Sequence, residues 1–510
     1  MPSSPCRLRA LPFLIAALCA VLLAACGGSG DPDAEPASVV PASAPLYFEV
    51  TVRPEGDVRA DVEAAARKIF RQEQPVAELR RLIDQGLAKE DVSFGEDIEP
   101  WLGRRIGFFA TNLTQDEPDV AFVAAVEDTK EALDSIAAVD ENEAELQERE
   151  YNGTSYRFDP EDATALAEVG EFVVLGDQAL VGQIIDAEEG GEVLTDDDRF
   201  SQAREAVGEE GIGFGYLNVQ ALLDLAGQDG SIPPQGLEPV RQLIGESVAL
   251  SLTAQESAVA LDVVSVGAKP QPGTDPAAVA EAVKTLPAGS LAGLGLGDIG
   301  AQVEGQLAAS GLGPNVLGQV EQATGINVQE DLLSWMGQGS AFVQGTGVGD
   351  IGGALIVQTE DRQATLDALE QIQPLLEAQD ATVEEVDEGG LQGLEAEFEG
   401  LPLPVYLVVA DERFLVALGD AALESATDPQ GALGDDQGFK QAAGALGEGM
   451  QPSFYASVPG LVALAESFGL AQDPSFQQTR PYLETFTALV GGSARDGEVS
   501  RSRLALGLAE

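Results

Sequence analysis

Residues 194–210 read LTDDDRFSQAREAVGEE, and residues 433–449 read LGDDQGFKQAAGALGEG. The two stretches share a leucine, an acidic pair, a phenylalanine and a Gly-Glu dipeptide at the same spacing. Similarity of one part of a chain to another, over this length, is the signature of a repeated structural unit. We therefore expect the chain to contain one unit twice.

Further pairs of similar segments occur in the same order along the chain. They are DIEPWLG (97–103) with DLLSWMG (331–337), EDTKEALD (127–134) with EDRQATLD (360–367), and FVVLGDQAL (172–180) with FLVALGDAAL (414–423). Between the two sets lies a stretch rich in Pro and Gly, which is typical of a linker. The sequence thus predicts a first repeat at 39–266, a linker at 267–276 and a second repeat at 277–510.

Each repeat is expected to be α+β. Residues 47–52 alternate between apolar and polar, with Glu49 on the polar side, as a half-buried strand does. Residues 57–70 then change to the helical period. Alternation at 248–252 and 259–263 predicts a closing antiparallel hairpin with one solvated face. We expect two tandem homologous repeats, each a mainly antiparallel sheet with helices covering one side.

The N-terminus has the organisation of a bacterial lipoprotein signal. A basic start at residues 7–9 precedes an apolar run at 11–25, too short to be a confident membrane-spanning helix of about 20 residues. The run ends in LAAC, which resembles the bacterial lipobox. An ordinary secretory signal with a chance cysteine is the alternative. We expect residues 1–25 to be removed, Cys26 to carry the lipid, and residues 26–38 to form a lipidated flexible tether.

The composition excludes several classes of function. The 510 residues include 86 Asp or Glu and 27 Lys or Arg, which gives a formal net charge of −59. Nucleic-acid phosphates are bound by clustered Lys and Arg, so we expect no nucleic-acid partner. The chain has no histidine, which removes His-based catalysis and His metal ligands. Hydrophobic residues make up 44% of the chain, enough to form large cores.

Two motifs suggest ligand sites, and each has a structural alternative. Gly295, Gly297 and Gly300 form a G-x-G-x-x-G sequence, as in dinucleotide-binding turns, but the equivalent part of the first repeat has no glycine. The acidic runs at 196–198 and 435–436 suggest calcium, but their spacing is not that of an EF-hand. We favour a glycine-rich strand end and helix capping, respectively. We expect no cofactor and no metal.

The tryptophans and two tyrosines occupy equivalent positions in the two repeats. Trp101 corresponds to Trp335, and Tyr216 to Tyr455. Such rings can line a ligand pocket, but their retention in both repeats favours core packing. A pair of carboxylates is the one catalytic arrangement that the composition freely permits. We assign no catalytic residue.

The whole pattern resembles a family of bacterial extracytoplasmic lipoproteins that is catalogued only as a domain of unknown function. The residues that carry the resemblance are the lipobox with its acidic tether, the VPASAPLY opening at 40–47, DIEPWLG at 97–103, FVVLGD at 172–177 and DDRF at 197–200. The resemblance covers nearly all of the mature chain. It implies export, anchoring and an α+β fold, and it brings no activity, cofactor or site residue.

Three classes of function remain open at this point. We expect a non-catalytic binding or interaction protein, held by its lipid on the extracytoplasmic face of the cell membrane. Its partner is unknown and either basic or apolar, because so acidic a surface favours basic partners. The alternatives are a carrier or chaperone for lipid or another apolar ligand, which needs an apolar cavity, and a carboxylate-based hydrolase, which needs two acids in one cleft.

Overall fold

The structure is a computed structural model that describes residues 31–87, 92–112, 118–139, 146–161, 163–208, 211–228, 234–310, 313–347 and 349–509. The predicted signal peptide and Cys26 lie outside the described residues. Within the described ranges no helix is both long and apolar enough to span a membrane. The chain divides into two compact units, residues 1–268 and 269–510.

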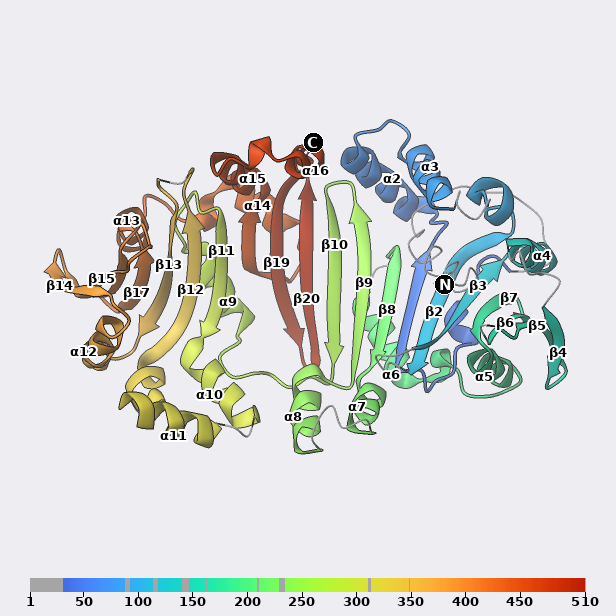
Figure 1. Cartoon of the computed structure of the whole chain (residues 1–510), viewed down its shortest axis with the longest axis horizontal. Helices are drawn as coiled ribbons and strands as arrows, with labels where there is room; N and C mark the ends of the chain where they lie inside the picture. The colour runs from blue at the N-terminus through green and yellow to red at the C-terminus, as the bar shows by residue number, and fades with distance from the viewer. Residues whose placement is uncertain are drawn as a thin grey trace, which may run out of the picture. The chain divides into compact units, whose positions relative to one another are not determined.

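The first unit is built on an antiparallel sheet with the strand order β10-β9-β8-β1-β2-β3-β7-β6-β5-β4 (Figure 1). The strands are β1 (Leu46–Thr51), β2 (Leu102–Asn112), β3 (Asp119–Val126), β4 (Gln147–Tyr151), β5 (Thr154–Asp159), β6 (Thr164–Val169), β7 (Phe172–Asp177), β8 (Gly213–Asn218), β9 (Ser247–Gln255) and β10 (Ala258–Val266). The helices are α2 (Gly56–Phe70), α3 (Pro75–Leu87), α4 (Thr129–Val139), α5 (Gln178–Glu188), α6 (Asp198–Val207), α7 (Val219–Gln228) and α8 (Pro234–Ile244). Single helical turns are η1 (Pro36–Ser38), η3 (Phe94–Ile98) and η5 (Leu194–Asp196).

The second unit has an antiparallel sheet with the order β20-β19-β18-β11-β12-β13-β17-β16-β15-β14, which matches the first strand for strand. The strands are β11 (Ala292–Asp298), β12 (Met336–Gln344), β13 (Gly352–Thr359), β14 (Thr382–Glu388), β15 (Leu391–Glu397), β16 (Val405–Ala410), β17 (Arg413–Leu418), β18 (Gln451–Ser457), β19 (Phe486–Asp496) and β20 (Val499–Leu508). The helices are α9 (Pro276–Lys284), α10 (Ile299–Ser310), α11 (Gly313–Thr324), α12 (Arg362–Glu377), α13 (Asp420–Thr427), α14 (Gln437–Gly444), α15 (Val458–Ser467) and α16 (Pro474–Leu483). Helical turns are η6 (Val328–Leu332), η7 (Leu333–Trp335), η8 (Leu433–Asp435) and η9 (Leu470–Gln472). The prediction of an α+β protein with antiparallel sheets is confirmed.

Each sheet has two chemically different faces. We call one the tyrosine face, because it carries Tyr47 and Tyr216 in the first unit and Tyr455 in the second. Helices α5 and α6 pack on it in the first unit, and α9, α13 and α14 in the second. We call the other the leucine face, because it carries Leu250 in the first unit and Leu294 in the second.

The main cores of the leucine faces lie toward one side of each sheet. In the first unit this core contains Trp101 and side chains from α3, η3 and α4. In the second unit it contains Trp335 and side chains from η6 and α12. A smaller cluster in the first unit joins α7 and α8 to Val248 of β9. These clusters bury part of each leucine face against helices.

The polarity of the two faces differs from the expectation at β1 and at the closing hairpin. Glu49, expected on a solvated side, is only 4% exposed and lies on the tyrosine face. The β9-β10 hairpin forms as predicted, with Leu252 opposite Leu261, but these leucines are 39% and 40% exposed. Ser251 and Asp262, on the opposite face of the same hairpin, are 2% and 1% exposed. Alternation shows which residues share a face, but the packed helices decide which face is covered.

Residues 31–38, which we expected to belong to a flexible tether, pack against the first sheet. Residues Pro36–Ser38 form η1, and Ala37 is fully buried. The backbone N–H of Arg104 donates to the carbonyl oxygen of Pro32 at 2.8 Å. The folded body therefore includes residues that the sequence assigned to the tether.

Candidate functional site

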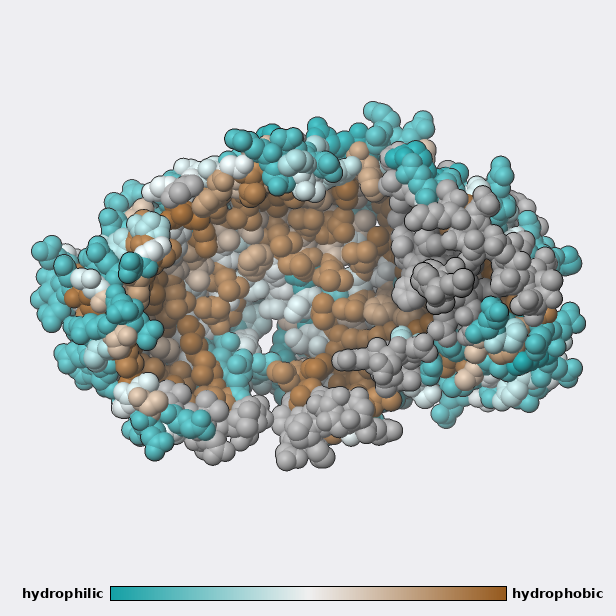
Figure 2. Space-filling view, viewed as in Figure 1, coloured by the Kyte–Doolittle hydropathy of each residue, from teal (hydrophilic) through white to brown (hydrophobic). Residues whose placement is uncertain are grey.

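A continuous row of apolar residues crosses the leucine face of the second unit. Its members are cross-strand partners, running from β20 to β16: Leu504, Gly491, Phe454, Leu294, Ala341, Leu355, Val416 and Leu407. Leu504 and Leu294 are 42% and 39% exposed, and Val343 in the next row is 41% exposed. Figure 2 shows hydrophobic residues gathered over β11 and β12 on this face.

The first unit has the corresponding row on the corresponding strands. Its members, from β10 to β6, are Val263, Leu250, Gly215, Phe48, Phe108, Phe122, Leu175 and Leu166. The rings of Phe48 and Phe108 stack at 6.3 Å, and those of Phe108 and Phe122 lie 5.2 Å apart. In the next row, Leu252 and Leu261 are the exposed leucines of the β9-β10 hairpin.

We define an apolar strip in each unit by its exposed large side chains, which are Leu252 and Leu261 in the first unit, and Leu294, Val343 and Leu504 in the second. Single exposed leucines are normal on a protein surface, whereas aligned ones mark an interaction site. Each buried apolar Å² is worth about 25 cal/mol. An apolar occupant would therefore gain free energy by covering the strip.

The opposite face of the β9-β10 hairpin is the more polar one, although helices cover it. Ser247, Ser251, Thr253 and Asp262 are all at most 6% exposed. Helix α6 contacts both β9 and β10, and its Phe200 ring lies against Tyr47 and Tyr216 on this face. A hairpin that only had to remain soluble would place these polar side chains toward water and its leucines under the helices. The reversed arrangement indicates that the leucine face has a purpose other than solvation.

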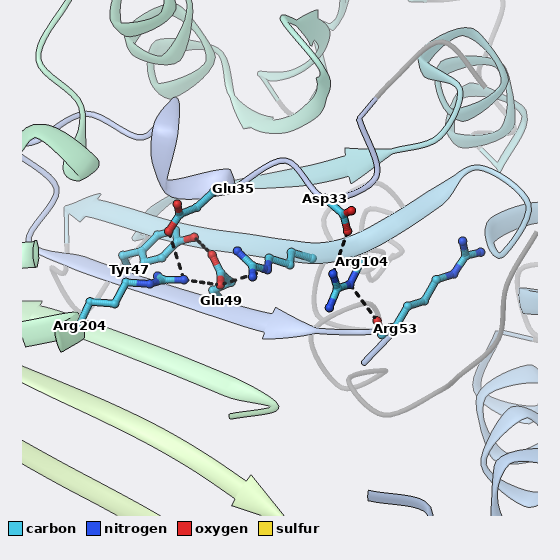
Figure 3. A network of polar contacts seen from close by, with 8 residues as sticks. Asp33, Glu35, Tyr47, Glu49, Arg53, Arg104 and Arg204 are labelled. Atoms are coloured by element: carbon cyan, nitrogen blue, oxygen red, sulfur yellow. Dashed lines mark hydrogen bonds and ion pairs between the residues drawn. The ribbon is translucent and has the colours of Figure 1, made fainter. Parts of the chain in front are cut away.

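A polar network lies on the tyrosine face of the first unit (Figure 3). The hydroxyl of Tyr47 donates to Glu49 Oε2 at 2.7 Å, and Arg204 Nη2 donates to Glu49 Oε1 at 2.9 Å. The same Arg204 nitrogen lies 3.2 Å from Glu35 Oε1, and Arg105 Nε lies 4.0 Å from Glu49 Oε1. The Arg204 guanidinium also lies 4.6 Å from the ring centroid of Phe214. These contacts compensate the buried charge of Glu49.

Burial dominates the electrostatics of this network. Loss of water raises the pKa of Tyr47 well above its usual value, and the negative charge of Glu49 raises it further. For Arg204, burial opposes the charged form, but attraction to Glu49 and Glu35 outweighs it and raises the pKa. Tyr47 therefore remains a neutral donor and Arg204 remains a cation. The network is thus an ion pair with a hydrogen-bonded phenol, in which Nη1 of Arg204 has no hydrogen-bond partner among the described residues.

Two ion pairs of this region hold the N-terminal segment. Arg104 Nη1 donates to Asp33 Oδ1 at 2.9 Å, and its Nε donates to the carbonyl oxygen of Arg53 at 3.3 Å (Figure 3). Arg204 reaches Glu35 from α6. Residues 31–38 thus attach both to β2 and to α6.

The second unit fills the same region in a different way. Gly293 and Gly295 of β11 stand where Tyr47 and Glu49 stand in β1, as the pairings to Tyr455 and Tyr216 show. A Cβ on Gly295 would lie 2.6 Å from the carbonyl oxygen of Val279, so α9 packs directly on the strand. The polar network is therefore particular to the first unit.

The two tryptophans make the same contacts in their units. Trp101 Nε1 donates to the carbonyl oxygen of Asp97 at 2.7 Å, and Trp335 Nε1 donates to that of Asp331 at 2.8 Å. Both rings are 2% exposed. The structure thus places them in cores, as the interpretation of core packing requires.

The tyrosines that the sequence singled out are also packed. Tyr216 is fully buried with its ring 5.1 Å from Phe200, and Tyr455 is 5% exposed with its ring 5.5 Å from Phe439. Burial raises the pKa of Tyr216 to about 12 and raises that of Tyr455. Among the residues that the structure describes, none is a hydrogen-bond partner of the buried Tyr216 hydroxyl.

The acidic runs cap helices. Asp197 accepts from the backbone N–H of Arg199 at the start of α6, and Asp436 accepts from those of Gly438 and Phe439 at the start of α14. Among the residues that the structure describes, no group of His, Cys, Asp and Glu is arranged to hold a metal ion.

The G-x-G-x-x-G sequence lies at the end of an antiparallel strand, not in a parallel βαβ unit. Gly295 and Gly297 belong to β11, which pairs antiparallel with β12 and β18. Gly297 has φ +73°, and a Cβ there would lie 2.2 Å from the carbonyl oxygen of Gly273. Gly300 leaves room for the carbonyl oxygens of Leu333 and Met336. Backbone packing explains all three glycines.

Sequence reasoning did not identify the strip or the polar network. Leu294 and Leu504 come together only through strand pairing. Arg204 and Glu49 are 155 residues apart in the chain. No local pattern predicts such a contact.

The comparisons with known proteins identify a family whose function is unknown. A family model described as "Protein of unknown function (DUF3352)" matches residues 10–508. Curated proteins include no match to the sequence. Solved structures include none either.

Proposed function

This chain belongs to the DUF3352 family of proteins of unknown function, and we propose that it is a lipid-anchored protein of the cell envelope that binds an acyl chain on its leucine faces. The single observation that carries the proposal is the apolar strip on each leucine face, which in the first unit lies opposite the buried polar residues of the β9-β10 hairpin. The role is that of a non-catalytic carrier or binding protein.

The chemistry of the rows favours a hydrocarbon occupant. Both rows consist of Leu, Val, Phe, Ala and Gly, so their side chains offer no hydrogen bond. Protein interfaces, by contrast, carry about one hydrogen bond per 100–200 Å². An acyl chain needs none. The net charge of −59 also disfavours an acidic macromolecule.

The length of the strip suits one acyl chain. Leu504 and Leu294 are separated by three strand spacings, from β20 through β19 and β18 to β11. At about 4.8 Å per spacing, this is roughly 14 Å. The hydrocarbon of one bilayer leaflet is about 15 Å thick, half of the core. One chain can therefore lie across these strands.

Duplication explains why both units carry the strip. The strand orders agree, and the Trp101 and Trp335 contacts are the same. An isolated bridge joins Pro41 to Val193 in the first unit, and another joins Pro287 to Ala432 in the second. These features support descent of 39–266 and 277–510 from one ancestral repeat. Cys26, at the predicted lipobox, supplies the membrane attachment in this proposal.

The experiment is displacement of an uncharged apolar fluorophore, N-phenyl-1-naphthylamine, by hexadecanoic acid. Full burial of a leucine is worth about 1.5–3 kcal/mol, so covering the 39% and 42% exposed Leu294 and Leu504 contributes about 1 kcal/mol each. The double variant Leu294→Ser/Leu504→Ser should weaken binding to the second unit about tenfold or more. Leu401→Ser is the control, since Leu401 is 41% exposed and lies off the strip. Equal losses in both variants, or no binding by the wild type, would contradict the proposal.

A further inference from the structure

A cleft of about 330 Å³ lies between the β4-β5 hairpin and α5 in the first unit. Its lining includes Tyr151, Tyr156, Gln178, Gly182, Gln183 and Asp186. Pockets that bind small molecules have volumes of about 300–1,000 Å³, so the cleft is large enough for a small ligand. It lies on strands that the apolar strip does not include.

The turn of the hairpin fixes one wall of the cleft. Asn152 and Gly153 connect β4 to β5 with φ of 46° and 86°, the left-handed pair that a two-residue hairpin turn requires. Asn152 Nδ2 donates to Asp186 Oδ1 at 2.6 Å, and the Tyr151 hydroxyl donates to Asp186 Oδ2 at 3.0 Å. The tip of the hairpin is thereby attached to α5. The Tyr151 side chain is still 41% exposed.

The other wall combines an amide with a second phenol. Gln178 Nε2 donates to the Tyr156 hydroxyl at 2.7 Å, and Gln178 Oε1 accepts from Arg149 Nη1 at 3.3 Å. Arg149 itself lies 3.5 Å from the ring centroid of Phe158. The side chains around the cleft are thus phenols, amides, one carboxylate and the apolar Ala179, Val181 and Ile185, with one guanidinium nearby.

Charge and shape together select the chemical class of the ligand. The lining residues include one acid, Asp186, and no basic side chain, and Glu189 adds negative charge near Tyr151, so an anionic ligand is disfavoured. A carboxylate has about four lone-pair sites, and Asp186 uses two, so it can accept further hydroxyl groups. Tyrosine combines an apolar ring with a polar tip. We infer that the cleft binds a neutral sugar ring, whose hydroxyls bond Asp186 and Gln183 and whose C–H groups contact Tyr151.

The fold itself does not require this cleft. The equivalent hairpin of the second unit, β14-β15, turns through Gly389 and Gly390, and Glu388 precedes the turn where Tyr151 does in the first unit. The second sheet has the same strand order without a tyrosine at this position. The residues of the cleft are therefore free to serve a ligand.

The test is saturation-transfer NMR and calorimetry with glucose, galactose, mannose and N-acetylglucosamine on the full chain. At least one sugar should bind with a Kd of about 1 mM or tighter. Tyr151→Ala should weaken this binding at least tenfold. Gly182→Leu should abolish it, because the added side chain starts 3.7 Å from the Tyr151 ring and enters the cleft. If either of these variants unfolds, Tyr151→Phe replaces it in the test. It removes only the hydroxyl that holds Asp186, so it should weaken sugar binding about threefold to tenfold.

Tyr482→Ala is the matched control, because Tyr482 is 50% exposed and belongs to the second unit. It should leave sugar binding unchanged. The inference is overturned if none of the four sugars binds, if the Tyr151 and Gly182 variants bind as the wild type does, or if spermidine binds in their place. Displacement of the apolar fluorophore should be unaffected in the Tyr151 variants, so this result and the acyl-chain proposal fail or succeed separately.

Discussion

Glu49 and Arg204 form the shortest ion pair of the polar network, and their energies should be coupled. Glu49 is 4% exposed, and the Arg204 side chain is 30% exposed. Arg204→Met removes the main partner of a buried carboxylate, which costs about 3–5 kcal/mol in fully buried pairs. Because Arg204 is partly exposed and Arg105 lies nearby, we expect a loss of about 2 kcal/mol in the free energy of unfolding.

The double variant Glu49→Gln/Arg204→Met tests the same contact. Once the buried charge is removed, the loss of Arg204 matters less. The double variant should be more stable than the sum of the two single losses predicts, by about 1 kcal/mol or more. Urea denaturation measures all four proteins of the cycle. Additive losses would show that the contact contributes no coupling energy.

The charge of Asp197 makes the stabilisation by the N-terminal cap of α6 depend on pH. Burial alone would raise its pKa, but hydrogen bonds from the side chain and backbone of Arg199 outweigh burial and lower it below the ordinary 3.8. A carboxylate with a lowered folded-state pKa stabilises above its unfolded-state pKa and loses this contribution as the pH falls through the folded value. Asp197→Asn retains a capping side chain without the charge.

We therefore expect wild type to exceed Asp197→Asn in stability by up to about 1 kcal/mol at pH 7. The difference should shrink as the pH falls below about 4 and disappear once Asp197 is protonated in the folded state as well. Denaturation at a series of pH values measures it. A difference that is constant with pH would assign the effect to something other than this charge.

At the scale of elements, the two tyrosine faces are packed differently, because α9 lies directly on β11 where the first unit has the polar network. A substitution at this contact tests the difference. Gly295→Ala places a Cβ 2.6 Å from the Val279 carbonyl oxygen and 2.8 Å from Val279 Cγ1. Overpacking of this kind costs about 1–3 kcal/mol, so the second unit should lose that much stability. Gly318→Ala is the control. Gly318 lies inside α11 with nothing within 4 Å of an added Cβ, so alanine should be neutral or stabilise by up to about 1 kcal/mol. Equal stability of the two variants would contradict the account of α9.

The elements themselves were largely predictable from the sequence. Periodicity predicted the α+β class and the β9-β10 hairpin, because side-chain direction follows backbone geometry. Acidic residues before an apolar stretch predicted the caps at Asp197 and Asp436, because capping is local chemistry.

The polarity of the faces was not predictable in the same way. Alternation groups Leu252 with Leu250, but only the packing of α6 on the opposite face and the exposed leucines show that their face is the less covered one. Contacts such as Arg204 with Glu49 depend on pairing between distant parts of the chain. The strip and the network were therefore missed, whereas the tryptophan cores were found because they recur.

At the scale of the whole molecule, anchoring depends on one residue in this account. Cys26→Ser should release the protein from the membrane into the soluble fraction, because the acyl chains supply the attachment. A surface of net charge −59 is repelled by anionic headgroups and cannot replace them. Fractionation of cells expressing wild type and variant measures the shift. Retention of the variant on the membrane would contradict the lipobox interpretation.

The most direct measurement of the central claim is photolabelling of the protein with a diazirine analogue of hexadecanoic acid, followed by peptide mapping. We predict that the label falls on strand peptides of the leucine faces, which contain Leu294, Val343 and Leu504 in the second unit and Leu252 and Leu261 in the first. Unlabelled hexadecanoic acid should compete with it. Label confined to the exposed apolar side chains outside the strip, such as Phe468 at 52% and Leu243 at 51% exposure, would contradict the account.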